Sequence, residues 1–155
     1  MAIKSLTEEQ LYDSLAVATA RIQPAQLGGA TFGLNRVLDP ARQEFLRKLK
    51  TPNQSRLQYA SGIPQVLSMM NGSLTAQATE PAKSDIIMAL NAPFFTDEER
   101  LEGVYLAALS RPPREDEQTR IGSYVAGYAV GEERQKALGD VLWALLNSAE
   151  FALNH

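Results

Sequence analysis

Apolar residues recur at intervals of three and four along most of the chain, which is the spacing that lines up side chains on one face of an α-helix. The predicted stripes, in chain order, are Leu11, Leu15, Ala18 and Ile22; Ile63, Val66, Leu67, Met70 and Leu74; Leu101, Val104, Tyr105, Ala108 and Leu109; Ile121, Tyr124, Val125 and Tyr128; and Leu138, Val141, Leu142, Leu145 and Leu146. Shorter helices are predicted in "DPARQEFLRKLK" and "DIIMALNA". No segment alternates apolar and polar residues over the length of a strand. The chain is therefore predicted to be all-α, with residues 1–155 forming one irregular bundle of about six to seven helices.

Polar residues at the predicted helix starts support this interpretation. Thr7 with Gln10, and Thr96 with Glu99, have the three-residue spacing of a capping box, in which each member accepts a backbone N–H of the other. Asp39 stands directly before a proline, which fits an N-cap followed by the residue favoured at the first helical position.

Two stretches lack helical spacing and are predicted to be irregular. In "QLGGATFGLNRVL" the glycines are Gly28, Gly29 and Gly33, whose spacing differs from G-x-G-x-x-G and which no Lys-Ser/Thr pair follows. A turned connector is therefore favoured over a phosphate-binding loop. Residues 51–62 are polar and form the second irregular stretch.

The composition excludes several kinds of chemistry. Hydrophobic residues make up 45% of the chain and charged residues 21%, as in ordinary globular proteins. Cysteine is absent, which excludes disulfides, thiolate nucleophiles and Cys-ligated metals. Because His155 is the only histidine, no metal site is predicted, and we expect no cofactor in this chain.

The charge is unevenly distributed along the chain. The net charge is −3, but residues 93–155 carry six basic and eleven acidic residues, a net charge of −5. The acidic residues cluster at 97–99, 115–117 and 132–133, where predicted helices begin and negative charge complements the helix dipole. A nucleic-acid surface would need a basic stripe, and a membrane span would need about 18 consecutive apolar residues. The sequence has neither feature and no secretion leader, so no nucleic-acid partner and no membrane span are predicted.

The last predicted helix is apolar over a wide arc, which is typical of a helix with neighbours on more than one side. Trp143, the only tryptophan, is predicted to anchor the core, with a stacking platform for a ring as the alternative. Gly139 is predicted to let another element come close. Asn147 and Ser148 are predicted to end this helix and cap a final short turn that Phe151 pins to the body.

Four polar residues are candidates for a binding site: Asn71, Arg111, Glu150 and His155. No catalytic residue is predicted. His155 ends the chain, and chain ends are usually poorly fixed, whereas a catalytic base needs a fixed position. Glu150 lies outside the acidic clusters, but a capping or surface role is favoured for it over acid catalysis.

Four stretches resemble a known family. They are "SLTEEQLYDSLAVAT", "GIPQVLSMMNGSL", "LEGVYLAALSRPPREDE" and "DVLWALLNSAEFALNH". In this order they resemble the C-terminal domain of planctomycete-type DUF1553 (PSD1) proteins. The matching residues are Asn71-Gly72, Tyr105-Leu106, Ser110-Arg111-Pro112, Asn147-Ser148, Glu150-Phe151 and Asn154-His155. The chain departs from the family pattern at Arg114, where a threonine cap is usual, and in "TPNQSRLQYAS", which lacks the cysteines of some members.

The resemblance implies that the chain is the C-terminal part of a larger exported protein. Relatives commonly carry a signal peptide, a cytochrome c-like domain and a DUF1549 domain before this one, so any haem would belong to an upstream domain. The resemblance defines no catalytic residues.

The sequence and the resemblance leave two functions open. The first is a non-catalytic helical module that packs against the upstream domains or a protein partner, which predicts an exposed apolar patch. The alternative is an accessory part of a carbohydrate-processing site shared with an upstream domain. That alternative requires at least three of the four candidate residues to converge on one cleft.

Overall fold

The structure is a computed structural model that describes residues 4–20, 39–49 and 72–154. Its elements are β1 (Lys4–Ser5), α1 (Glu8–Ala18), α3 (Pro40–Leu49), α5 (Ser73–Thr79), α6 (Asp85–Leu90), α7 (Asp97–Leu109), α8 (Glu115–Ala126), α9 (Glu132–Leu146), α10 (Ala149–Ala152) and β2 (Leu153–Asn154). The all-α prediction is confirmed, with eight helices in the described part of the chain rather than six to seven. The predicted glycine-rich connector, the polar stretch at 51–62, Ile22 of the first stripe and all of the Ile63–Leu74 stripe except Leu74 lie outside the described residues.

The predicted caps begin the helices. The Thr7 hydroxyl accepts the Gln10 N–H at 3.2 Å, and the Gln10 side chain accepts the Thr7 N–H at 3.0 Å. Thr96 and Glu99 form the same box at the start of α7. A carboxylate oxygen of Asp39 accepts the Ala41 N–H, the first N–H of α3, at 3.0 Å. These local signals fix where the helices start because each supplies an acceptor for a backbone N–H that lacks a helical partner.

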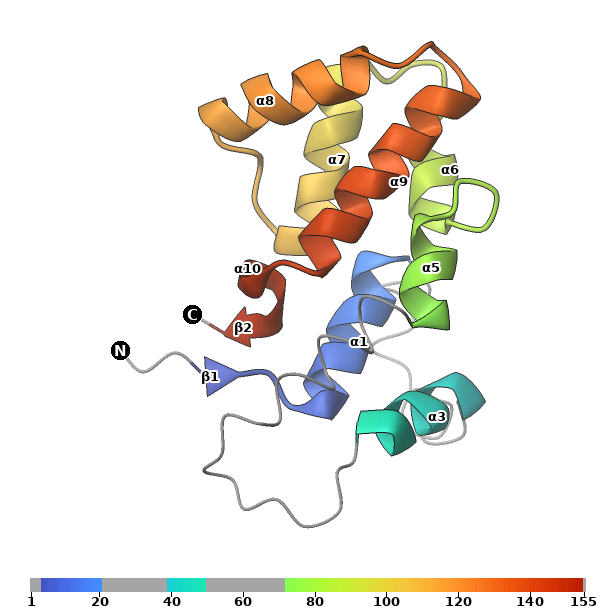
Figure 1. Cartoon of the computed structure of the whole chain (residues 1–155), viewed down its shortest axis with the longest axis vertical. Coiled ribbons are helices and arrows are strands. Elements are labelled where there is room, and N and C mark those ends of the chain that lie inside the picture. Colours follow the sequence, from blue (N-terminus) through green and yellow to red (C-terminus); the bar gives the residue numbers. More distant parts are fainter. Residues whose placement is uncertain (1–3, 21–38, 50–71, 155) are drawn as a thin grey trace.

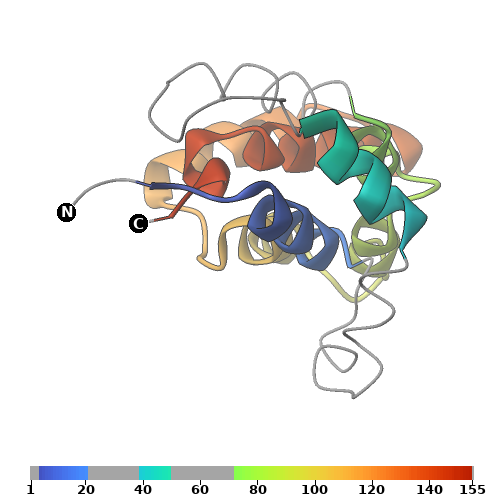
Figure 2. The ribbon, with the colours of Figure 1, turned by 90° about the horizontal axis from the view of Figure 1, so that it is seen from below.

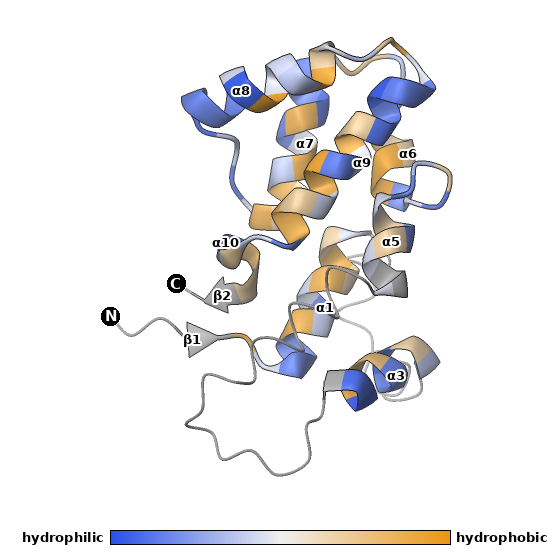
Figure 3. Ribbon diagram, in the orientation of Figure 1, coloured by the Kyte–Doolittle hydropathy of each residue, from blue (hydrophilic) through white to orange (hydrophobic). Residues whose placement is uncertain are grey.

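Helix α9 runs through the middle of the fold, with α7 and α8 on one side of it and α5 and α6 on the other (Figure 1). The stripe predicted for α9 is buried, and the one predicted for α7 is buried except for the half-buried Leu109. Figure 3 shows the apolar faces of α1, α7 and α9 turned toward each other, while the start of α9 and most of α8 are hydrophilic. These three helices contribute most of the core, and α3, α6, α8 and α10 add Phe45, Ile87, Leu90, Val125 and Phe151.

Helix α5 approaches α9 unusually closely at Gly139. A Cβ atom on Gly139 would lie 2.2 Å from the carbonyl oxygen of Thr79, far inside van der Waals contact. The prediction that Gly139 admits a neighbouring element is confirmed, and the neighbour is the backbone at the end of α5.

Helix α8 is less buried than its stripe predicts. Val125 is buried and Ile121 is half-buried, but Tyr124 and Tyr128 are 42% and 39% exposed. The prediction that both tyrosines face the core is therefore wrong. Their rings pack edge to face on the surface, and the Tyr124 hydroxyl donates to Asp140 of α9 at 3.0 Å. The hydroxyl–carboxylate bond is available only at the surface edge of the α8–α9 contact, which holds the tyrosines there.

The two ends of the described chain pair with each other. Lys4 and Ser5 of β1 lie opposite Asn154 and Leu153 of β2 in an antiparallel register (Figure 2). The sequence gives no strand signal for these residues, because two-residue strands are too short to show alternation. The Ser148 hydroxyl caps α10 by accepting the Phe151 N–H at 3.2 Å, and Phe151 is buried, as predicted.

Candidate functional site

Arg111 joins three elements at the lower end of α7. It follows Ser110, which ends that helix in the left-handed conformation (φ 56°) and turns the chain toward α8. The Arg111 Nε and Nη2 atoms donate to the two carboxylate oxygens of Glu150 in α10, at 2.6 and 2.8 Å. Nη1 and Nη2 donate to the two carboxylate oxygens of Glu117 in α8, at 2.8 and 3.0 Å. One guanidinium therefore holds two carboxylates, each through a bidentate pair.

The cluster is packed against the core. The Arg111 guanidinium lies 5.6 Å from the centre of the Tyr105 ring, which is fully buried. Hydrogen bonding to Arg111 lowers the pKa of Glu117 to about 2 and also lowers the pKa of Glu150. Burial, together with the charge of Glu117, raises the pKa of the Tyr105 hydroxyl. Arg111, Glu117 and Glu150 therefore keep their charges over the ordinary pH range.

The cluster has no hydrogen-bond donor left for a ligand. A guanidinium has five N–H groups. Four of those of Arg111 bind Glu117 and Glu150, and the fifth, on Nη1, donates to the Pro112 carbonyl at 3.0 Å. This geometry suits a cross-link between helix ends better than the recognition of a substrate carboxylate or phosphate.

The structure brings together two of the four predicted site residues. Arg111 and Glu150 are bonded to each other, whereas Asn71 and His155 lie outside the described residues. Glu117 is the member of the cluster that sequence reasoning missed. The sequence feature that could have identified Glu117 is its position three residues after Arg114, the N-cap of α8. The Glu117 carboxylate accepts the Arg114 N–H at 2.8 Å. Arginine has no acceptor, so the carboxylate half of a capping box remains at this helix start.

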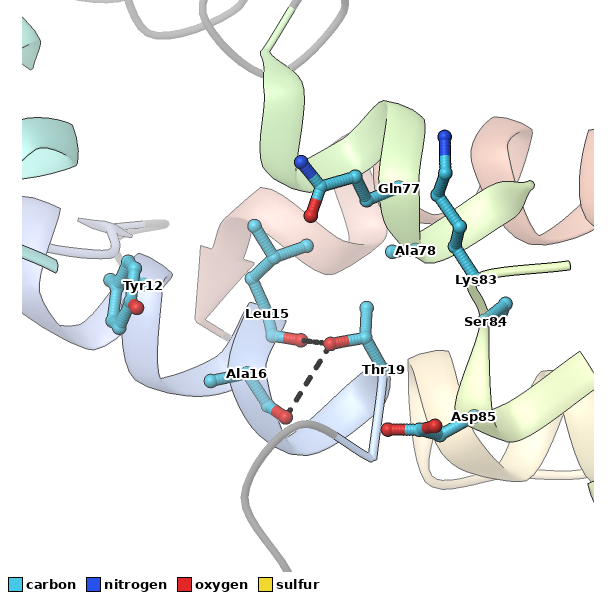
Figure 4. Close-up of a pocket in the computed structure, with 9 residues that line it drawn as sticks. All are labelled: Tyr12, Leu15, Ala16, Thr19, Gln77, Ala78, Lys83, Ser84 and Asp85. Atoms are coloured by element: carbon cyan, nitrogen blue, oxygen red, sulfur yellow. Dashed lines mark hydrogen bonds between the residues drawn. The ribbon is translucent and has the colours of Figure 1, made fainter. Parts of the chain in front are cut away.

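A cavity of about 180 Å³ lies where α1 meets α5 and α6 (Figure 4). Leu15, Ala16 and Ala78 give it apolar walls. Two of the hydroxyls around it are hydrogen-bonded: the Thr19 hydroxyl donates to the Leu15 carbonyl at 2.8 Å, and the Ser84 hydroxyl accepts the Ile87 N–H of α6 at 3.3 Å. The Lys83 ammonium extends away from Thr19 and pairs with Glu80. Gln77 and the exposed carboxylate of Asp85, at the start of α6, complete the polar part of its lining.

Trp143 is less buried than predicted. It is half-buried and does not belong to the core cluster, in which Val141, Leu142 and Leu145 on the same helix take part. The prediction of a core anchor is wrong, because the buried stripe of α9 faces α7 and α5 on the sides that Trp143 does not occupy. The carbonyl of Trp143 accepts the Asn147 side-chain amide at 2.8 Å, which ends α9 where predicted.

The opposite end of α7 exposes apolar side chains. Phe94, in the α6–α7 loop, is 75% exposed and packs only on the adjacent Phe95 ring among the aromatic side chains described. Val130, in the α8–α9 loop, is 82% exposed, and Tyr128 precedes it. Exposed carboxylates flank them at the starts of α7 and α9, and these are Glu98, Glu99, Glu132 and Glu133. We call Phe94, Tyr128, Val130 and these four glutamates the Phe94 surface.

Asp97 holds the two loops of this surface together. Its carboxylate accepts one hydrogen bond from Arg100 of α7 and one from Arg134 of α9. Arg134 also donates to the Tyr128 carbonyl, at 2.8 Å from Nη2. Arg100 donates to the Ala92 carbonyl at 3.2 Å. These bonds connect the α6–α7 loop, which contains Phe94, to the α8–α9 loop, which contains Val130, and both loops lie at the same end of the molecule (Figure 1).

Residues 4–20, 39–49 and 72–154 contain no group of three or more acidic or histidine side chains placed to hold a metal ion. In the same ranges, no helix has the length and hydrophobicity needed to cross a bilayer. Comparisons of the chain with models of protein families, with curated proteins and with solved structures find no match.

Proposed function

We propose that this chain is a non-catalytic helical interaction module that packs against neighbouring domains of a larger exported protein or against a protein partner. The observation that carries the proposal is the Phe94 surface. Phe94 and Val130 are the two most exposed large hydrophobic side chains in the described part of the chain, and Asp97 with its two arginines places them at one end. Exposed apolar side chains gathered in one place and rimmed by polar residues are typical of protein interfaces.

The larger protein in this proposal rests on the resemblance to DUF1553 proteins. The motif "LSRPPREDE" supplies Arg111 and Glu117, and "LLNSAEF" supplies Glu150. In the structure these two motifs meet in a single ion cluster. These residues of the two motifs therefore join α7, α8 and α10. Such a structural role supports a non-catalytic module.

The arrangement of Arg111 favours the interaction module over an accessory part of a carbohydrate-processing site. A residue that binds a sugar or a carboxylate must have free donors or acceptors facing a cleft. The five N–H groups of Arg111 are bonded within the protein, and both Glu150 oxygens accept from it.

The proposal is tested by photocrosslinking in the cell that makes the protein. A photoreactive amino acid is introduced in place of Phe94, and in a matched control in place of Leu106, an α7 residue that is 46% exposed. We expect a discrete protein adduct, or an internal crosslink to another domain, from position 94 and much less from position 106. Equal labelling at the two positions, or none at position 94, would overturn the proposal.

A further inference from the structure

The apolar part of the Phe94 surface is small but suited to anchoring a partner. Phe94 and Val130 are exposed over most of their area, and the half-exposed Tyr128 adds a second aromatic ring. Aromatic side chains contribute much of the binding energy at protein interfaces when a partner covers them. The surface therefore offers a few strong contacts rather than a broad apolar face.

Most of the charges around these side chains are negative. Glu98, Glu99, Glu132 and Glu133 are exposed. Only one of the four has an ion pair among the described residues: Glu132, which lies 3.0 Å from Lys136. Glu99 accepts from Thr96, which lowers the pKa of this carboxyl and keeps it ionised.

The arginines at this end do not offset that charge at the surface. The side chains of Arg100 and Arg134 are only 18% and 17% exposed. Their guanidiniums bind Asp97 and the carbonyls of Leu90, Ala92 and Tyr128. An approaching molecule therefore meets mainly carboxylates around an apolar centre, because both arginines are shielded and the exposed Lys136 is paired with Glu132.

We propose that the Phe94 surface binds a basic amphipathic segment of a protein partner, in which lysines or arginines flank an apolar side chain. This inference rests on the proposed function and adds the chemistry of the partner. The apolar side chain would cover Phe94 and Val130, and the flanking cations would face Glu98 and Glu133. A second copy of the chain would bring the same carboxylates face to face, and nucleic acids and anionic lipids would be repelled in the same way.

The test uses the 155-residue chain and two labelled synthetic peptides of about 18 residues, long enough for five helical turns. One peptide has leucines at helical spacing with lysines elsewhere, and the other has the same leucines with glutamates. Fluorescence anisotropy measures binding, and backbone NMR shifts locate it. We expect the basic peptide to bind, with the shifts concentrated at residues 92–99 and 127–133. Binding should weaken strongly in salt of about 0.5 M, because exposed charges are then screened beyond roughly 4 Å.

Variants separate the apolar contribution from the charge contribution. The double variant Phe94→Ser and Val130→Ser should weaken the basic peptide by roughly tenfold. Its control, Leu106→Ser, should have no effect. Glu98→Lys with Glu133→Lys should reverse the preference between the peptides, while Asp116→Asn at the start of α8 should not. Circular dichroism establishes that each variant is folded.

Three results would overturn the inference: equal binding of both peptides, binding of the basic peptide that the serine variants leave unchanged, or no binding of it at about millimolar concentration. The crosslinking experiment separates this failure from failure of the proposed function. An adduct at position 94 without binding of the basic peptide would leave the interaction module standing and reject the basic partner. Binding of the basic peptide without a cellular adduct would reject the interaction module, and with it the protein partner, although the surface could bind such a segment in solution.

Discussion

The two ends of α7 carry ion clusters of opposite composition. At the lower end one cation, Arg111, holds two carboxylates, Glu117 and Glu150. At the upper end one carboxylate, Asp97, holds two arginines. The lower cluster connects the end of α7 to α8 and α10, the upper one connects α7 to α9, and both are partly shielded from water. They differ in what surrounds them, because the lower cluster has a buried tyrosine ring beside it and the upper one supports exposed loops.

The two clusters depend to different degrees on their central residue. Removal of Arg111 would leave Glu117 and Glu150 close together with no cation between them. Removal of the charge on Asp97 would leave two arginines that still bind the carbonyls of Leu90, Ala92 and Tyr128. We therefore expect the lower cluster to stabilise the fold and the upper one mainly to hold the Phe94 surface in shape.

A substitution at Gly139 of α9, outside both clusters, should lower the free energy of unfolding more than a change in either cluster. In Gly139→Ala the new methyl group would collide with the Thr79 carbonyl oxygen, which belongs to the backbone and cannot rotate away. We expect a loss of about 3 kcal/mol or more in the free energy of unfolding, measured with urea. The control is Gly103→Ala, where the methyl group meets the movable end of the Leu90 side chain at 2.6 Å. A cost there within about 1 kcal/mol is expected, since alanine also favours the helix.

Arg111→Met should destabilise the protein by about 2–3 kcal/mol. The methionine keeps much of the side-chain volume but leaves two carboxylates without a partner, and breaking a shielded ion pair from one side is strongly unfavourable. Urea unfolding measures the change. Lys48→Met, which removes the exposed i,i+4 pair with Glu44 in α3, is the control and should change stability by less than about 0.5 kcal/mol. A similar small effect for both variants would show that Arg111 is not a cross-link.

The lower cluster also predicts an acid-sensitive stability. The pKa of Glu117 is about 2 in the folded protein against 4.5 for a free glutamate, and that of Glu150 is lowered as well. A lowered folded-state pKa stabilises above the unfolded pKa, and this stability is lost as the pH falls from about 5 toward 2. We expect a loss on the order of 2 kcal/mol over that window in urea titrations. The loss should shrink in Arg111→Met, and an unchanged loss in that variant would assign the acid sensitivity elsewhere.

Asp97→Asn should have the smallest effect, about 1 kcal/mol. The asparagine keeps one carbonyl oxygen as an acceptor, and Arg100 and Arg134 keep their backbone partners. NMR should show larger changes at residues 91–96 and 127–131 than in the core. If this variant proved as damaging as Arg111→Met, the distinction between the two ends of α7 would fail.

Features decided within a few residues could be predicted from the sequence. The capping boxes at Thr7 and Thr96, the buried stripe of α9 and the break at Asn147-Ser148 depend on neighbours in sequence, and the structure has all of them. Gly139 was also predictable, because a glycine inside an apolar helix usually marks a close approach.

Features decided by distant partners could not be predicted. Tyr124 looks like a core residue in the periodic pattern, but its hydroxyl reaches Asp140 only at the surface. Trp143 depends on which sides of α9 are covered by α5 and α7. For the candidate site, Arg111 and Glu150 could be singled out as unusual, but they are 39 residues apart in sequence, and their pairing depends on how α10 folds back.

The pairing of β1 with β2 has a mechanical consequence. The register places Lys4 opposite Asn154 at the outer edge and Ser5 opposite Leu153 further in. Both chain ends leave the strand pair at the same edge because the strands are antiparallel. A force that pulls the ends apart therefore breaks the hydrogen bonds between the strands one after another, and does not load all of them at once in shear. The pair should therefore open at low force and pass the load to the bond from the Leu6 N–H to the Ala152 carbonyl, and then to the buried Phe151. Under tension the β1–β2 pair would therefore separate first, while the packing of α7 against α9 stays intact.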